Sequence, residues 1–171
     1  GTYWFPFAKG GAYSPFYADV HLCIYWSDDG AEILSFPKSF VRSPGHYFRP
    51  GLTWPLRTQR GFGIRTLPVG SVFGHKGPAA FSSDDYPGQL LALLSVTTSA
   101  TFCYLVELQM AFGSYEVGVI QRTPVPRLTD SDAIDLARLG RRAWSLKRSL
   151  DTTNETSHAF LLPPGLNESV T

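Results

Sequence analysis

Seven cations and no carboxylate occupy the stretch from residue 37 to residue 83. The cations are Lys38, Arg42, Arg49, Arg57, Arg60, Arg65 and Lys76. The whole chain of 171 residues carries 15 basic and 14 acidic side chains, so its net charge of +1 divides into +7 in this stretch and −6 elsewhere. Such segregation of charge favours a surface that faces a polyanion, although a solvated loop face without acids is the plain alternative.

Aromatic residues and glycines separate these cations. Tyr47, Phe48, Trp54 and Phe62 lie among them, with glycines at four nearby positions. An arginine fork matches phosphate oxygens and the guanine edge, an aromatic ring can stack on a base, and glycine lets the backbone approach closely. The combination indicates contact with DNA or RNA.

Motifs for catalysis are missing from the sequence. It has no G-x-G-x-x-G, no P-loop, no H-E-x-x-H and no G-x-S-x-G. Cys23 and Cys103 lie in apolar runs without ligand spacing, so we expect two buried free thiols and no zinc site. The histidines likewise show no spacing that suggests metal ligation. Asp84, Asp85 and Glu116 are the remaining candidates for a metal-dependent nuclease.

Short apolar runs between turns predict an α+β fold with a curled or partly barrel-like sheet. The predicted strands are residues 20–26, 31–36, 52–58, 62–67, 71–73 and 115–120. The first two are expected to form a hairpin. Low charge (17%) together with 29 glycines and prolines fits a domain rich in loops and strands.

Two segments predict helices. Residues 88–111 are apolar at mixed spacing and predict a buried helix, or a helix pair broken near residues 97–99. Residues 130–150 predict a second helix, opened by a capping box of Thr129 and Asp132. Its heptad seam packs on its own domain or docks another helix, and comprises Leu136, Leu139, Ala143, Leu146 and Leu150. No stretch approaches the length of a membrane helix.

An ordered set of motifs over most of residues 4–162 resembles a known family. The motifs are FRPGLTW at 48–54, GFGIRTLPVGSVF at 61–73, the leucines of 90–94, YEVGVI at 115–120 running to PVP at 124–126, and the region of Trp144, Lys147, Arg148, Asp151 and NETSHAF at 154–160. They resemble the target-recognition region of large N6-adenine DNA methyltransferases, including those of BREX and DISARM phage defence and fused type II restriction–modification enzymes.

The resemblance implies a C-terminal specificity module for double-stranded DNA. A separate catalytic domain of the same parent chain would bind S-adenosylmethionine and flip the adenine, since this sequence lacks the family's cofactor and [N/D/S]-P-P-[Y/F/W] motifs. This segment itself would need no cofactor or metal. The start at Gly1 without methionine also suggests a piece of a longer, cytoplasmic polypeptide. We expect a recognition domain at 1–127 and a helix and tail at 128–171.

Within that module each cation has an expected role. Arg57, Arg60 and Arg65 are expected to read bases with support from Thr53 and Trp54. Lys38, Arg42, Arg49 and Lys76 are expected to position phosphates. For Trp54 a core position, and for Arg65 a structural ion pair, are the competing interpretations.

Two other classes of function stay open. A protein-interaction module would use the heptad seam and the aromatic N-terminus (Tyr3, Trp4, Phe5 and Phe7) to bind a partner subunit. An independent nuclease would use Asp84, Asp85 and Glu116 with a metal ion. Neither alternative requires the segregated positive charge.

Overall fold

The first of two small sheets joins the start of the chain to its middle. The computed structural model describes residues 3–111 and 113–162. In the first sheet, β1 (Trp4–Ala8) lies between β2 (Cys23–Tyr25), which is antiparallel to it, and β5 (Val72–Phe73), which is parallel to it. The parallel pairing of β1 with β5 connects residues about 65 positions apart and closes the large loop that contains the basic segment.

The second sheet is antiparallel and built from the basic segment. In it β3 (Gly51–Thr53) lies between β4 (Arg65–Leu67) and β6 (Ala79–Ala80). A Cβ on Gly51 would lie 2.7 Å from the Ala80 carbonyl oxygen, so this close pairing requires glycine. The α+β class is confirmed. Within the described residues neither sheet closes on itself, and the curled or partly barrel-like arrangement is not confirmed.

Five α-helices lie in the described part of the chain. They are α1 (Ala31–Ser35), α2 (Pro87–Thr97), α3 (Ala100–Glu107), α4 (Val117–Arg122) and α5 (Asp130–Ser149). Short 3₁₀ turns at Asp28–Gly30, Pro44–His46 and Leu150–Thr153 complete the list. The break predicted near residues 97–99 is confirmed, because the Ser99 hydroxyl caps α3 by accepting from the Phe102 amide at 3.2 Å.

The main hydrophobic core lies between the second sheet and the helices α2, α3 and α4. Leu52, Ile64, Leu94 and Val106 are almost fully buried there. Trp54 is 1% exposed, and its indole N–H donates to the Tyr115 carbonyl at 2.8 Å, which fixes the start of α4 over the sheet. A smaller cluster around Trp26, Tyr47 and Val72 supports the first sheet.

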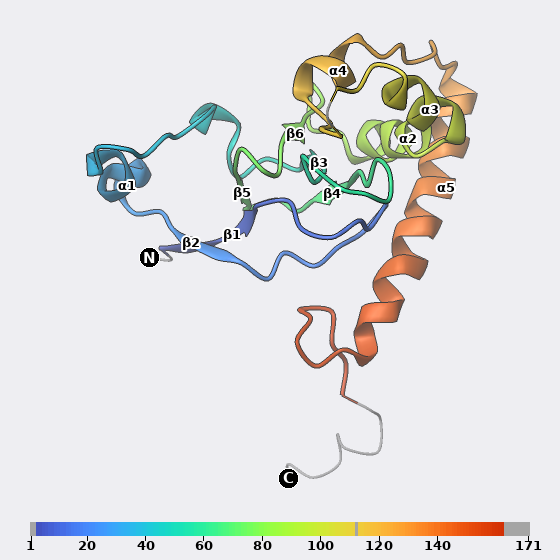
Figure 1. Cartoon of the computed structure of the whole chain (residues 1–171). Helices are drawn as coiled ribbons and strands as arrows, with labels where there is room; N and C mark the ends of the chain where they lie inside the picture. The colour runs from blue at the N-terminus through green and yellow to red at the C-terminus, as the bar shows by residue number, and fades with distance from the viewer. Residues whose placement is uncertain (1–2, 112, 163–171) are drawn as a thin grey trace, which may run out of the picture.

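Helix α5 runs along one side of the molecule, and the segment that carries α1 projects from the opposite side (Figure 1). The capping box of Thr129 and Asp132 is present as predicted. The buried contact of α5 is Gly140 on α2, whereas Leu139, Leu146 and Leu150 of the predicted seam are 50–67% exposed. Leu136 and Ala143 of the seam are half-buried, so the seam is only in part the packing face, and the closest contact with α2 is made at Gly140, which the seam does not include.

Two predicted strands are helices. Residues 31–35 form α1, and residues 117–120 belong to α4. For α4 a contact distant in sequence contributes, since the Tyr115 amide donates to the Leu56 carbonyl at 2.8 Å just before its first turn. The buried position predicted for Cys23 is also wrong, because its side chain lies on the exposed β2, while Cys103 is half-buried.

Within the described residues no single helix is long and apolar enough to cross a membrane. Helices α2 and α3 pass that test of length and composition only together, across a bend of 66°. The predicted division at residue 127 stays a prediction, and residues 163–171 of its second part lie outside the described residues.

Candidate nucleic-acid interface

Five of the seven cations in the acid-free segment are exposed. They are Lys38, Arg42, Arg57, Arg60 and Lys76. In the part of the chain that the structure describes, none of the five forms a salt bridge with a carboxylate. Their charges therefore remain available to an external anion.

Arg49 is engaged inside the molecule. Its Nη2 lies 2.6 Å from Oδ1 of Asp85 and 2.8 Å from the Ser82 carbonyl oxygen, and its guanidinium covers the Phe81 ring at 5.3 Å. Hydrogen bonding to Arg49 holds the pKa of the Asp85 carboxyl below its usual range. This pair secures the connection between β6 and α2.

Arg65 is buried, with 6% of its surface exposed. Its guanidinium donates to the Ala12 carbonyl at 2.9 Å and to the Gly10 carbonyl, so it holds the loop after β1 against β4. Burial lowers the pKa of Arg65. The side chain thus has the surroundings of a structural group.

Thr53 and Trp54 also lie inside the molecule. The Thr53 hydroxyl donates to the Pro78 carbonyl at 2.8 Å and helps to hold β3 beside β6. Trp54 belongs to the main core. Among the three arginines expected to read bases, only Arg57 and Arg60 therefore reach the surface.

Arg57, Arg60 and Lys76 come from two neighbouring turns. The Arg57 Nε donates to the Ser114 hydroxyl at 2.7 Å, which orients that side chain over the loop before α4. Arg60 lies in a turn that Thr58 closes by accepting from its amide at 2.9 Å. The Lys76 carbonyl accepts from the Leu56 amide at 3.0 Å, so the two turns lie side by side.

The projecting arm, residues 27–46, carries the other two exposed cations together with exposed rings. Phe36 is 61% exposed and Phe40 is 75% exposed, and the Arg42 guanidinium lies 4.7 Å from the centre of the Phe40 ring. Sequence reasoning missed both rings, although the run FPKSFVR interleaves aromatics with cations. The rings that it favoured instead are buried or half-buried: Tyr47, Phe48, Trp54 and Phe62.

A groove of about 580 Å³ separates the arm from the body, and we call it the aromatic groove. Aromatic side chains from the first sheet, from the loops beside it and from the arm form its walls, together with Phe81, which directly follows β6. The walls include Phe7, Trp26, Phe40, Tyr47, Phe73 and Phe81, and the polar lining includes Arg42, Ser43, His46, His75, Glu116 and Gln121. The groove thus lies between Arg42 of the arm and His75, the neighbour of Lys76 in the chain.

The three carboxylates of the nuclease hypothesis have separate surroundings. Asp85 pairs with Arg49, Asp84 accepts from the Tyr86 amide at 3.2 Å, and Glu116 lies at the rim of the aromatic groove before α4. In the described ranges, no three histidine, cysteine, aspartate or glutamate side chains are grouped so as to hold a metal ion.

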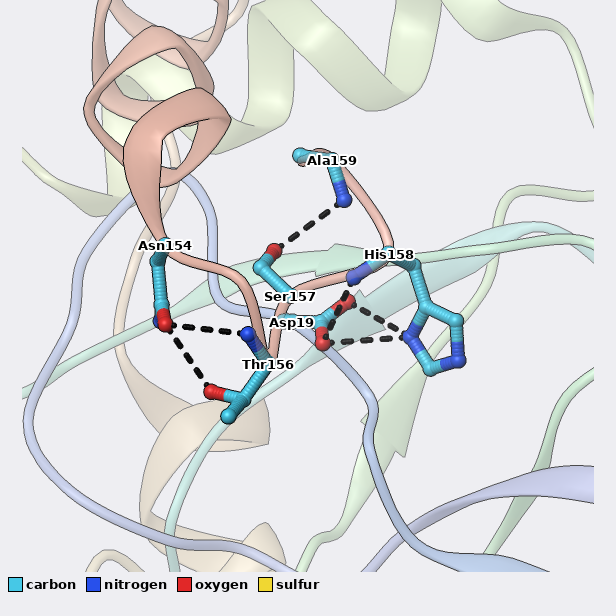
Figure 2. Close-up of polar contacts among 6 residues, drawn as sticks. All are labelled: Asp19, Asn154, Thr156, Ser157, His158 and Ala159. Carbon is cyan, nitrogen blue, oxygen red and sulfur yellow. Dashed lines mark hydrogen bonds and ion pairs between the residues drawn. The ribbon is translucent and has the colours of Figure 1, made fainter. Parts of the chain in front are cut away.

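The tail after α5 folds back onto the loop that precedes β2. Figure 2 shows Asp19 between the backbone and the ring of His158, with its carboxylate 3.0 Å from the ring Nδ1 and 3.3 Å from the His158 amide nitrogen. Asn154 closes the turn by accepting from the Thr156 amide and hydroxyl. This contact ties the tail to the loop between β1 and β2.

Comparison with known proteins finds relatives of this chain. No family model matches the chain. It is 27% identical over 157 residues, 92% of its length, to adenine-specific methyltransferase BrxX of Escherichia coli O9:H4 (strain HS). It is 26% identical over 174 aligned residues, covering 91% of its length, to adenine-specific methyltransferase PglX of Lacticaseibacillus casei (strain Zhang). This chain is similar to adenine-specific methyltransferases.

The similar region is a small part of each relative. The chain spans 12% of the length of BrxX and 14% of the length of PglX. Both alignments nevertheless cover more than nine-tenths of this chain. The resemblance to a methyltransferase family is therefore supported over most of the chain.

Proposed function

We propose that this chain is the DNA-recognition module of an adenine-specific DNA methyltransferase in phage defence or restriction–modification. It grips double-stranded DNA and positions it for a separate catalytic domain of the same, larger parent chain. The observation that carries the proposal is the group of five exposed cations without carboxylate partners in the described residues, in a chain similar to adenine-specific methyltransferases.

The proposal assigns roles by exposure. Arg57 and Arg60 read base edges, because a guanidinium fork on a turn can reach into a groove of the duplex. Lys38, Arg42 and Lys76 neutralise phosphates. Arg49, Thr53, Trp54 and Arg65 support this surface from within, through the contacts described above.

The parent enzyme would bind S-adenosylmethionine in its catalytic domain, in the bacterial cytoplasm. The fit of this chain to that cofactor is poor, since its sequence has no G-x-G-x-x-G between a strand and a helix. We therefore derive no methyl-transfer step from the residues of this chain.

Fluorescence anisotropy with a mixed-sequence duplex tests the proposal across a series of salt concentrations. Three phosphate contacts predict that log affinity falls with log salt with a slope of about −3. The variant Arg60→Glu/Lys76→Glu removes two exposed side chains that make no side-chain hydrogen bond within the described residues. We expect it to bind at least about 10-fold more weakly and with a shallower slope.

The matched control is Arg141→Glu/Arg142→Glu, which makes the same change of charge on exposed positions of α5. Its salt slope should equal that of the wild-type chain. If both variants lost affinity equally, the loss would come from the change in net charge alone. That result would overturn the assignment of the DNA surface to residues 37–83.

A second candidate function rests on α5. Leu139 and Leu146 of α5 and Leu150 of the turn that follows form an exposed stripe. Such a stripe suits docking to another helix of the parent protein. Binding of a duplex that is weak and insensitive to salt would favour this candidate, and Leu146→Ser/Leu150→Ser would then abolish capture of the catalytic domain.

A further inference from the structure

The aromatic groove combines flat apolar walls with a cationic rim. From this we infer that it takes one unpaired nucleobase with its phosphate, so that the module holds an unstacked nucleotide beside the duplex. The inference rests on the proposed function, since it names a second element of DNA that the same basic surface binds. The ligand chemistry is a nucleotide, supplied by a DNA strand or by a free mononucleotide.

The walls suit a base because they consist of rings that the fold already holds in place. Trp26 and Tyr47 are 7% and 8% exposed and pack edge to face with centroids 5.1 Å apart. Phe73 packs on Tyr47 at the same separation. The ring that an incoming base can reach is Phe40, which is 75% exposed, while the buried Trp26 and Tyr47 hold the wall of the groove in place. Contact between a base and an aromatic ring is tolerant of sequence.

The rim supplies charge for a phosphate. Arg42 and His46 come from the arm and His75 comes from the turn beside Lys76, so donors face the groove from both sides. Arg42 is already held over the Phe40 ring. The volume of about 580 Å³ lies in the range of sites that enclose small ligands, and holds a base with its sugar and phosphate.

Glu116 gives the groove a preference among bases. It is the one carboxylate among the described residues that line the groove, and its side chain makes no capping hydrogen bond to α4 although it occupies the N-cap position. Its oxygens are therefore free to accept from an exocyclic amino group, as glutamate does from cytosine N4. Cytosine and adenine carry such a group and thymine does not.

Affinities for three matched duplexes test the inference: fully paired, with a single bulged cytosine, and with an abasic site in that bulge. The bend of the two bulged duplexes is similar, so their difference isolates the base. We expect the cytosine bulge to bind about 10-fold more tightly than the abasic bulge, and more tightly than a thymine bulge.

Three variants locate the effect. Gly118→Trp fills the groove from α4, where a Cβ has only the Arg122 guanidinium nearby, at 3.9 Å. It should abolish the preference for the bulged base while affinity for the paired duplex stays unchanged. Ser145→Trp, on the exposed side of α5, should leave the preference intact. Glu116→Gln should remove the difference between bulged cytosine and bulged thymine.

The outcomes separate this inference from the proposed function. Equal affinity for the cytosine and abasic bulges overturns the inference, while salt-dependent binding of the paired duplex would still support the module. If the wild-type chain binds no duplex, the proposed function fails. The nucleotide groove is then tested by titration with free dCMP, with the NMR signals of the His46 and His75 rings as the readout. Shifts of these resonances that Gly118→Trp abolishes support a nucleotide groove, and their absence overturns it.

Discussion

Arg49, Arg60 and Arg65 lie within 17 residues of one another and have three different surroundings. Arg60 is exposed, Arg49 pairs with Asp85, and Arg65 donates to backbone carbonyls of the loop after β1. A guanidinium that already satisfies buried acceptors contributes to folding, because its removal leaves those acceptors without a partner. An exposed guanidinium contributes instead to the potential that an anion meets.

The same substitution at two of these positions should therefore have opposite consequences. We expect Arg65→Met to lower the free energy of unfolding by about 1–3 kcal/mol, since the Gly10 and Ala12 carbonyls lose their donor. Its salt slope for DNA should not change. Arg60→Met should leave stability unchanged and weaken DNA binding. Urea unfolding and anisotropy on both variants measure this, and an unchanged midpoint with a reduced slope in Arg65→Met would assign Arg65 to the DNA surface instead.

At the scale of elements, the contact between α2 and α5 depends on one glycine. A Cβ on Gly140 would lie 2.6 Å from the Leu91 carbonyl oxygen and 2.6 Å from the Ser95 Oγ. The Ser95 hydroxyl in turn donates to the Leu136 carbonyl at 2.8 Å, so the two helices share a polar contact at their point of closest approach. The backbone of α2 at Leu91 lies directly opposite Gly140. A side chain at position 140 could therefore fit only if the two helices moved apart.

We expect Gly140→Ala to lower the free energy of unfolding by about 1–2 kcal/mol, because the strain of overpacking exceeds the gain in helix propensity. Gly118→Ala is the matched control, since the added Cβ in α4 meets only the Arg122 guanidinium, at an ordinary contact distance of 3.9 Å. That control should raise the free energy of unfolding by about 0.5–1 kcal/mol. Thermal or urea unfolding distinguishes them, and stabilisation by both substitutions would show that α2 and α5 are not in close contact.

The helices that the sequence predicts correctly carry their own local signals. Helix α5 has its capping box, and α2 and α3 have long apolar runs that a serine cap divides. Helices α1 and α4 are only five and six residues long, and helices of this length do not form without tertiary contacts. Their sequences therefore carry no helical signal of their own, and the short apolar runs predicted strands instead.

The candidate site divides in the same way. The concentration of positive charge in residues 37–83 is visible in the sequence alone, because it depends only on which residues occur there. Which cations reach the surface depends on distant partners, since Arg65 lies 53 residues from Ala12 and Arg49 lies 36 residues from Asp85. The exposure of Phe40 likewise follows from the arm projecting from the body, which no local pattern encodes.

At the scale of the whole molecule, the first loop and the last turn are held together around the C-terminal half of α5. Trp144 of α5 donates to the Thr66 hydroxyl at 3.0 Å and packs edge to face on Tyr17 at 6.0 Å. The contact of Asp19 with His158 lies just beyond (Figure 2). The loop between β1 and β2 thus contacts both α5, through Tyr17, and the tail, through Asp19.

Removal of the Asp19 carboxylate should therefore loosen the tail without unfolding the body. We expect Asp19→Leu to speed amide hydrogen exchange in residues 152–160, because the His158 amide and ring both lose their acceptor. Exchange in α2 should not change, since its contact with α5 is made at Gly140. Glu155→Gln, an exposed change in the same tail, should leave the exchange pattern as it is. Faster exchange throughout α5 would instead show that the tail contact holds the helix on the body, and the exposed leucine stripe would then depend on Asp19 for its presentation.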